Sequence, residues 1–255
     1  MVTRREDLRD FTGLHGVAFF GIVEIVVPIL EINKWDINAA DFAGSTALIW
    51  AARRGQEEIV KVLLEQKDVN PNLVDTGYGN TPVTPLSWAA EKGHEGLVRI
   101  FLGREDVNPN HADIFDGQTP LSWAAVEGYE EIVKMLLERE DVNPNHADTL
   151  DGQTPLSSAV ERGHEGVVKI LLEQKDVNPN QADTQYGRTP LSWVAGSGRE
   201  GVVKVLLERN DIRPAAPDNE NQTPLSLALS EGHDGVARIL REWDNDNSDK
   251  VNHSG

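Results

Sequence analysis

Apolar residues recur along this chain at helical spacings that alternate with polar, turn-rich stretches, and residues 119–153 show the pattern clearly. Leu121, Ala124 and Ala125 fall at i, i+3 and i+4, which predicts a short helix with one apolar face. A second predicted helix follows, with a broad apolar surface made of Ile132, Val133, Met135, Leu136 and Leu137. Residues 141–152 have no helical pattern and are dense in Asn, Pro, Asp and Gly, which predicts an extended, hairpin-like finger.

The ends of the first predicted helix carry recognisable signals. Thr119 is a good N-cap, and Pro120 suits the first helical position, where its missing N–H is not needed. Gly128 ends the helix because glycine accepts the left-handed conformation found just past a helix C-terminus. The unit therefore reads as helix, turn, helix and finger.

Near-copies of this unit fill the chain. Aligned on the threonine that precedes each first helix, they begin at Thr12, Thr46, Thr84, Thr119, Thr154, Thr189 and Thr223. The successive differences are 34, 38, 35, 35, 35 and 34 residues, and a period in this range predicts a stacked repeat array rather than one compact core. We expect one array over residues 1–243, with repeats near 12–45, 46–83, 84–118, 119–153, 154–188, 189–222 and 223–243.

The two ends of the array depart from the pattern. Phe19 and Phe20 occupy positions that are mostly polar in the other repeats, and the second helix, residues 22–30, is unusually apolar and contains Pro28. Either residues 1–11 cover this surface, or a segment of a longer protein covers Phe19, Phe20 and the region of Val26. At the other end, Trp243 is expected to seal the last layer, and residues 244–255 are expected to be a disordered polar tail.

The recurring residues resemble the ankyrin repeat family. Its pattern appears here as Thr119-Pro120-Leu121, Ala124-Ala125, Gly128, Val133, Leu136-Leu137, Asp141-Val142-Asn143 and Asp151-Gly152. Two features depart from the usual repeat: Ser87, Ser122, Ser157, Ser192 and Ser226 stand where the family usually has His, and Asn-Pro-Asn lengthens the finger. This variant is similar to ankyrin arrays of large multidomain proteins of filamentous fungi, including NTPase-containing, nonself-recognition types. The resemblance implies an all-α ankyrin-repeat solenoid of seven helix-turn-helix repeats that binds other proteins and is intracellular, in the cytoplasm rather than the nucleus.

The composition narrows the kinds of partner. A net charge of −18 disfavours nucleic acid and anionic membranes. The longest apolar run, residues 19–30, contains Glu24 and Pro28 and is too short to span a bilayer. The chain has no cysteine, so disulfides and thiolate chemistry are excluded.

The residues offer no enzymatic or metal site. His94, His164 and His233 each follow a turn glycine, and they are a repeat or more apart. His111 and His146, with Asp113 and Asp148, sit in adjacent fingers, where equivalent atoms lie roughly 8–10 Å apart, far beyond a metal's ligand radius of about 2 Å. No phosphate loop, G-x-S-x-G or H-E-x-x-H motif is present. We expect no catalysis, metal or cofactor.

Candidate binding residues come from the positions that differ between repeats, which are the fingers and the two residues after each alanine pair. The resemblance places these positions on the concave, partner-binding surface. The predicted partner-binding residues are Phe42, Arg53, Arg54, Tyr78, Trp88, Lys92, Phe115, Gln118, Trp123, Glu127, Leu150, Arg162, Tyr186, Arg188 and Trp193. Finger aromatics such as Phe115 and Tyr186 suit interface hot spots, and packing between neighbouring fingers is the alternative.

Trp50, Trp88, Trp123 and Trp193 recur at one position, which Ser158 interrupts; we name these four residues the tryptophan ladder. The ladder either floors the binding groove or packs between first helices, and we expect half-buried rings with one open edge. The predicted function is a non-catalytic protein–protein interaction module that is monomeric unless the apolar first repeat self-associates. The alternative is a regulatory or scaffold segment of a larger protein, packed in cis against its own effector domain.

Overall fold

The structure, a computed structural model, describes residues 12–32, 36–75 and 83–252, with side chains through residue 246 except that of Ile32. In these ranges the chain forms fourteen helices and no strand, which confirms the predicted all-α class. The helices are α1 Gly13–Phe20, α2 Val23–Ile32, α3 Ala47–Arg54, α4 Glu57–Leu64, α5 Pro85–Glu91, α6 Glu95–Leu102, α7 Pro120–Glu127, α8 Glu130–Leu137, α9 Pro155–Arg162, α10 Glu165–Glu173, α11 Pro190–Ser197, α12 Glu200–Leu207, α13 Pro224–Ser230 and α14 Asp234–Asn252.

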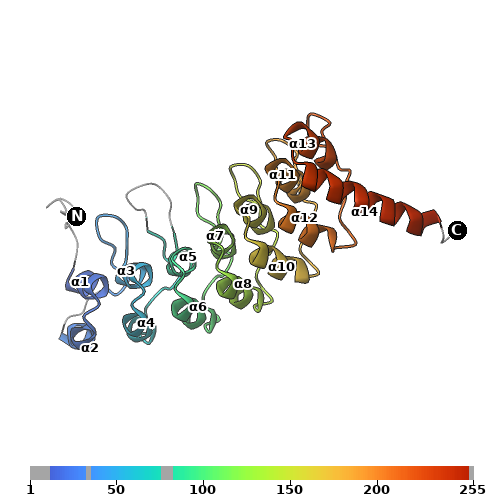
Figure 1. The fold of residues 1–255 in the computed structure, drawn as a ribbon. Helices are drawn as coiled ribbons and strands as arrows, with labels where there is room; N and C mark the ends of the chain where they lie inside the picture. The colour runs from blue at the N-terminus through green and yellow to red at the C-terminus, as the bar shows by residue number, and fades with distance from the viewer. Residues whose placement is uncertain (1–11, 33–35, 76–82, 253–255) are drawn as a thin grey trace. The chain divides into compact units, whose positions relative to one another are not determined.

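The chain divides into two compact units, one of residues 1–124 and 134–142, the other of residues 125–133 and 143–255. In the first unit α1 packs on α3 and α3 on α5, while α2 packs on α4 and α4 on α6. In the second unit α9, α11 and α13 form one such row, and α10, α12 and α14 form the other. Each unit therefore has a layer of first helices and a layer of second helices, and loops joining the repeats extend from the side of the first helices (Figure 1).

Local capping explains where the first helices begin and end. Thr84 Oγ1 accepts the backbone N–H of Ser87 at 3.2 Å, and the two hydroxyl oxygens lie 2.9 Å apart. The threonine of the repeats at 46, 119, 154, 189 and 223 accepts the corresponding N–H. Gly128 adopts φ 81°, the left-handed conformation predicted for it. The serine that replaces the family's usual histidine thus keeps a side-chain contact inside the cap.

The core of each layer consists of the small and branched residues that recur in the sequence. Ala51, Ala52, Ala89 and Ala90 are fully buried in the first unit, as are Leu63 and Phe101 of the second helices. Ala159 with Val160, and Val194 with Ala195, fill the same positions in the second unit. Short side chains here allow successive first helices to approach closely.

The asparagine that follows each proline in the Asn-Pro-Asn stretches, and Asn38 at the equivalent position after Ile37, binds the next repeat. Asn180 donates through Nδ2 to Asp211 O at 2.7 Å, and its Oδ1 accepts the backbone N–H of Arg213 at 2.8 Å. Asn38, Asn72 and Asn145 make the same pair of bonds, and Asn110 makes the first of them. We name these five residues the asparagine clamps.

Arginines after the second helices bind backwards, to the preceding repeat. Arg209 is held by Asp211 through two N–H···O bonds of 2.7 and 2.9 Å, and its Nη1 donates to Leu172 O and Gln174 O. Arg104 and Arg139 repeat this arrangement with Asp106 and Asp141. These hydrogen bonds satisfy carbonyls that a helix C-terminus leaves without intrahelical partners.

The C-terminal end corrects one prediction. Helix α14 continues to Asn252, so residues 244–252 are helical rather than disordered, and residues 253–255 lie outside the described ranges. No glycine or proline interrupts the sequence between Gly235 and Gly255, so a helix nucleated by the packing of Val236, Ala237 and Leu240 can continue. Trp243 Nε1 donates to Leu207 O at 3.1 Å, which places its ring against the preceding second helix as expected.

Candidate protein-binding surface

One aspartate organises each finger: Asp41, Asp75, Asp113, Asp148, Asp183 or Asp218, which we name the finger aspartates. The Asp113 carboxylate accepts the backbone N–H groups of Phe115, Asp116 and Gln118. The Asp113 backbone N–H donates to Gln118 O at 3.1 Å and closes the loop. Five other fingers have an equivalent closing bond. From the sequence, Asp113 and Asp148 were considered only as metal ligands. The recurrence of an aspartate five or six residues before most of the repeat threonines could have indicated their role in closing the fingers.

The finger aspartates also hold the tryptophan ladder. Trp50 Nε1 donates to Asp41 Oδ2 at 2.8 Å, and Trp193 Nε1 donates to Asp183 Oδ2 at 2.8 Å. Trp88 Nε1 reaches Asp75 Oδ2 at 3.1 Å. Trp123 Nε1 is buried and has no hydrogen-bond partner among the described residues. All four tryptophans are half-buried. Trp50, Trp88 and Trp193 therefore fix their fingers through the indole N–H and leave part of the ring open.

The pKa values of two finger aspartates, Asp75 and Asp218, differ from the ordinary value of the side chain. Burial raises the pKa of the Asp75 carboxyl above its ordinary value, although hydrogen bonds from the Val83 N–H and Trp88 oppose the shift. Burial also raises the pKa of Asp218, but the N–H groups of Gln222 and Glu220 and the guanidinium of Arg188 outweigh it and leave the pKa lowered. Both carboxylates therefore belong to the internal support of the fingers.

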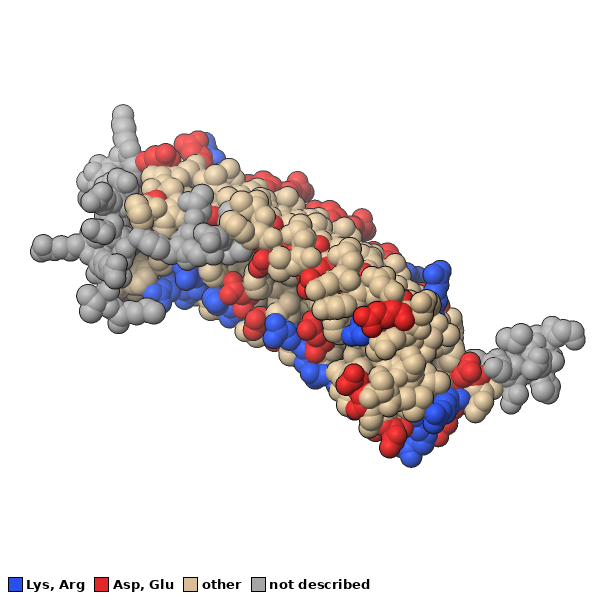
Figure 2. Space-filling view, turned by 90° about the horizontal axis from the view of Figure 1, so that it is seen from above, with Lys and Arg blue, Asp and Glu red and all other residues tan. Residues whose placement is uncertain are grey.

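The finger tips expose large apolar side chains. Phe42 is 53% exposed, Phe115 49%, Leu150 63% and Tyr186 42%. Ile114, which sequence reasoning missed, is 70% exposed beside Phe115. In Figure 2 basic and acidic side chains lie next to each other in several places on the viewed face, among uncharged atoms. Exposed aromatic and aliphatic tips on hydrogen-bonded loops are suited to contacts with another protein.

Backbone hydrogen bonds join neighbouring fingers of the second unit. Thr184 N donates to Asp151 O at 2.7 Å, and Asn219 N donates to Tyr186 O at 2.8 Å. The Tyr186 ring also stacks edge-on against Trp193, with ring centroids 5.7 Å apart. Tyr186 therefore contacts a neighbouring finger and still exposes part of its ring to solvent.

Cations and rings alternate along the first helices of the first unit. The Arg53 guanidinium carbon lies 4.4 Å from the Trp88 ring centroid and 5.6 Å from that of Trp50. Arg54 lies 4.0 Å from the Phe19 ring, and Lys92 Nζ lies 5.4 Å from Trp88. The side chains of Arg53, Arg54 and Lys92 are exposed.

The second unit has a hollow of about 160 Å³ at the corresponding face. Trp193, Gly196 and Ser197 of α11 line it together with Arg188, Leu227 and Glu231. Gly196 and Ser197 stand where the other regular repeats have longer residues such as Arg53-Arg54 or Glu161-Arg162, and a Cβ on Gly196 would meet nothing within 4 Å. Arg188 Nε donates to the buried Asp218 at 3.1 Å and lies against the Trp193 and Tyr186 rings.

The remaining predicted binding residues divide into three groups. Glu127 and Arg162 are exposed at the ends of their helices. Gln118 is only 9% exposed, so its prediction as a contact residue is wrong: its N–H and C=O close the finger on Asp113, which draws the residue inward. Tyr78 lies outside the described residues.

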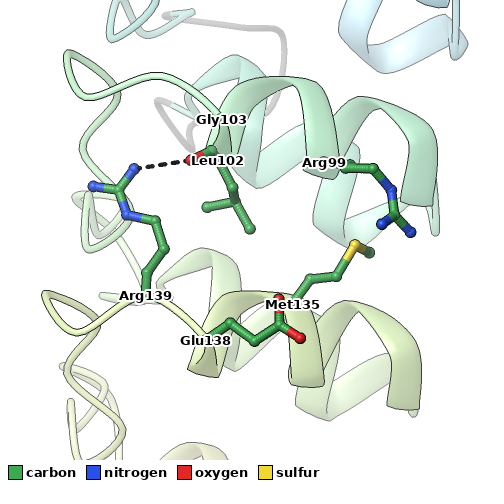
Figure 3. Close-up of a pocket in the computed structure, with 6 residues that line it drawn as sticks. All are labelled: Arg99, Leu102, Gly103, Met135, Glu138 and Arg139. Atoms are coloured by element: carbon green, nitrogen blue, oxygen red, sulfur yellow. Dashed lines mark hydrogen bonds between the residues drawn. The ribbon is translucent and has the colours of Figure 1, made fainter.

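A second hollow, of about 300 Å³, lies in the first unit between second helices α6 and α8, away from the predicted binding positions. Arg99, Leu102 and Gly103 face Met135, Glu138 and Arg139 across it (Figure 3). Gly103 takes the place of the glutamate found in other repeats, and the missing side chain leaves this space. Arg139 lines the hollow but directs its guanidinium to Asp141 and to carbonyls of the preceding repeat, so it is not available to a ligand.

The histidines after the turn glycines link repeats. His164 Nε2 lies 3.0 Å from Val126 O, and His233 Nε2 lies 3.0 Å from Gly196 O. Throughout the described ranges, no three His, Cys, Asp or Glu side chains converge as a metal site would require. Of the helices that the structure describes, none combines the length and apolarity needed to cross a bilayer.

Comparison with known proteins agrees with this architecture. A family model described as ankyrin repeats (3 copies) matches residues 14–113, 86–183 and 174–251. No curated protein matches the chain. Ankyrin repeats generally mediate protein–protein interactions and are typically non-catalytic, while the likeness to fungal multidomain arrays stays a prediction. The matched segments overlap and cover residues 14–251 of 255, so the chain belongs to the ankyrin repeat family.

Proposed function

We propose that this chain is a non-catalytic module that binds a partner protein through its finger tips and the exposed faces of its first helices. The observation that carries the proposal is that both units expose apolar finger tips on loops fixed by finger aspartates: Phe42, Ile114 and Phe115 in the first unit, and Leu150 and Tyr186 in the second. Loops that are ordered before binding lose little conformational entropy when a partner arrives. Large apolar side chains held in this way favour a protein ligand.

The hollow beside Trp193 adds a specific contact to this surface. Its volume of about 160 Å³ is close to the 150 Å³ or so of a cavity that holds one benzene ring. Trp193 and Leu227 supply its apolar wall, whereas Arg188 and Glu231 supply charge. We infer that one aromatic or branched side chain of the partner enters it.

Substitution of the finger tips tests the proposal. Phe115→Ser with Tyr186→Ser should abolish recovery of a partner from an extract of the native organism, measured by quantitative mass spectrometry after cross-linking. Leu229→Ser is the matched control: Leu229 is 45% exposed on α13, but it occupies the position of the buried Ala125 and Ala195, so it lies neither on a finger nor among the helix positions predicted to contact a partner. Equal recovery by both variants, with unchanged thermal unfolding, would exclude the finger tips as the binding surface.

The exposed apolar residues of the first repeat favour a second candidate function, packing in cis against another domain of a larger protein. Phe20 is 69% exposed, and Ile22, Val23, Ile25 and Val27 are each 40–47% exposed. Val26, in contrast, is fully buried and belongs to the core. Contiguous apolar surface of this kind marks an interaction site.

Dye binding and size measurements separate the two functions. Ile25→Ser with Val27→Ser should lower the binding of a dye specific for apolar surface and leave the finger-dependent partner bound. Loss of that partner would show that α2 belongs to the same interface. A dimer that the same pair of substitutions converts to a monomer would show instead that the first repeat self-associates.

A further inference from the structure

Three cations of the second and third repeats form one cluster with rings of the first three repeats. Phe19 at the end of α1 lies edge-on to Trp50 of α3, with ring centroids 5.1 Å apart. Arg53 lies against both Trp50 and Trp88, and Arg54 lies against Phe19. Lys92, just after α5, completes the set. We name Phe19, Trp50, Arg53, Arg54, Trp88 and Lys92 the cation–ring cluster.

The two arginines of the cluster differ from the arginines that connect repeats. Arg104, Arg139 and Arg209 direct their guanidinium donors to an aspartate and to backbone carbonyls. Arg53 and Arg54 make no ion pair or side-chain hydrogen bond with the described residues, and both are exposed. A guanidinium that lies on an aromatic ring keeps its N–H edge free and loses little further entropy when it binds a carboxylate.

The acidic groups nearest the cluster are already engaged. Asp41 and Asp75 are buried and accept the indole N–H groups of Trp50 and Trp88. Glu91 accepts from Lys92 Nζ at 2.6 Å, in a pair that is partly open to solvent. Arg53 also interacts electrostatically with Asp75, and Lys92 is paired with Glu91. The exposed guanidinium groups of Arg53 and Arg54 therefore carry the open positive charge of the cluster, and a partner carboxylate would compete with Glu91 for Lys92.

We propose that the cation–ring cluster binds an acidic, extended segment of a partner protein, with its carboxylates on Arg53, Arg54 and Lys92. This proposal rests on the proposed protein-binding function and names the chemistry of the ligand. The charge of the cluster is complementary to a run of Asp or Glu side chains, and a guanidinium can bind a carboxylate through two parallel N–H···O bonds. The half-exposed rings beside the cations would contact the aliphatic parts of the same segment.

A single-stranded nucleic acid is the competing ligand, since stacked rings and cations also suit it. The net charge of −18 opposes it, because nucleic acid carries a dense line of negative charge that the rest of this chain would repel. An acidic peptide can place a few carboxylates on the cluster and keep its other residues neutral. The protein ligand is therefore favoured.

The test measures binding of a fluorescein-labelled twelve-residue peptide of alternating Glu and Gly by fluorescence anisotropy at low and moderate salt. We expect binding that weakens with salt, no binding of the matching Gln peptide, and weaker binding of a single-stranded oligodeoxynucleotide of equal charge. Replacing Arg53, Arg54 and Lys92 together by Gln should weaken peptide binding about tenfold, the scale of three exposed charge pairs. Lys169→Gln, Lys175→Gln and Lys204→Gln together are the control, because they remove the same charge from exposed positions elsewhere.

The outcomes are distinct. Equal loss in both triple variants, tighter binding of the oligodeoxynucleotide, or binding only through self-association of the chain would each overturn the proposal. Arg53→Lys keeps the charge but loses the planar fork, so it should restore only part of the affinity. If finger-tip variants lose the native partner while the cluster variant keeps it, this inference fails and the proposed function stands.

Discussion

The asparagine clamps predict that one polar side chain contributes measurably to the coupling of two repeats. Asn180→Ala removes the Nδ2 bond to Asp211 O and the Oδ1 acceptor of the Arg213 N–H. Each hydrogen bond contributes a net 0.5–1.5 kcal/mol or so, which gives about 1–3 kcal/mol for the two. Because both bonds are exposed and water can replace them, we expect about 1–2 kcal/mol of lost unfolding free energy.

A neighbouring asparagine supplies the matched control. Among the described residues, Asn178 Oδ1 accepts the Asn180 N–H of its own repeat alone, at 3.1 Å, so Asn178→Ala should cost less, about 0.5–1 kcal/mol. Asn180→Asp keeps the acceptor for Arg213 but loses the donor, so its cost should include only the bond to Asp211. The two alanine variants therefore distinguish a bond between repeats from a bond inside one turn.

Urea unfolding followed by circular dichroism gives the free energies, provided that the denaturant dependence stays constant across the variants. Hydrogen exchange at the Arg213 amide gives the local readout: faster exchange in Asn180→Ala and retained protection in Asn180→Asp. Our reasoning would be refuted if Asn180→Ala were no less stable than Asn178→Ala, or if the Arg213 amide were equally protected in all variants.

Three further predictions concern the core, the glycines and the first repeat. Leu136→Ala should lower the unfolding free energy by about 2–5 kcal/mol in urea titration, because Leu136 is fully buried; a loss below about 1 kcal/mol would contradict its place in the core. Gly103→Ala should raise the melting temperature, by about 0.4–1 kcal/mol in free energy, because Gly103 has φ −70° and a Cβ would meet neighbours at ordinary contact distances. Gly163→Ala should lower the melting temperature, because φ is 80° at this residue and a Cβ would collide with Arg199. A higher melting temperature for Gly163→Ala than for Gly103→Ala would contradict the described turns. Burial lowers the pKa of His15 below its ordinary value of 6.5, although the charge of nearby Asp41 opposes this shift. The folded protein therefore favours the neutral imidazole. The resulting contribution to the free energy of unfolding is complete above pH 6.5 and is lost as the pH falls toward the folded-state pKa. Urea unfolding at several pH values should show this loss in the wild type and a smaller loss in His15→Gln, and parallel curves would refute it.

Much of the fold followed from the sequence because the relevant signals act over a few residues. Thr119, Pro120 and Gly128 bound a helix through local capping, and the spacing of Ala124 and Ala125 defines its buried face. Similar signals recur in seven repeats spaced 34 to 38 residues apart, so each local inference supported the others. The half-buried state of the tryptophan ladder was likewise predicted, from the large apolar area of the tryptophan side chain.

The features that were missed depend on contacts between distant residues. Asn178 and Asn180 look equivalent in Asn-Pro-Asn, yet the first bonds within its turn and the second bonds to residues 31 and 33 positions away. Gln118 is a separate case: Asp113, only five residues earlier, draws it inward, and the recurrence of this aspartate before the repeat threonines was not recognised as the signal. Residues 244–252 are polar, and their helix depends on packing earlier in α14.

The asparagine clamps and the backward-binding arginines have a consequence for how such a chain can change its length. Neighbouring repeats exchange hydrogen bonds in both directions: an asparagine clamp reaches forward to the backbone of the next repeat, and an arginine reaches back to carbonyls of the preceding one. Removing or duplicating one whole period would re-create every junction, whereas an insertion of a few residues at Asn-Pro-Asn would leave a donor facing the wrong carbonyl. Growth of the chain by complete copies is therefore easier than gradual lengthening, and short insertions are tolerated at the finger tips, where these bonds are not made.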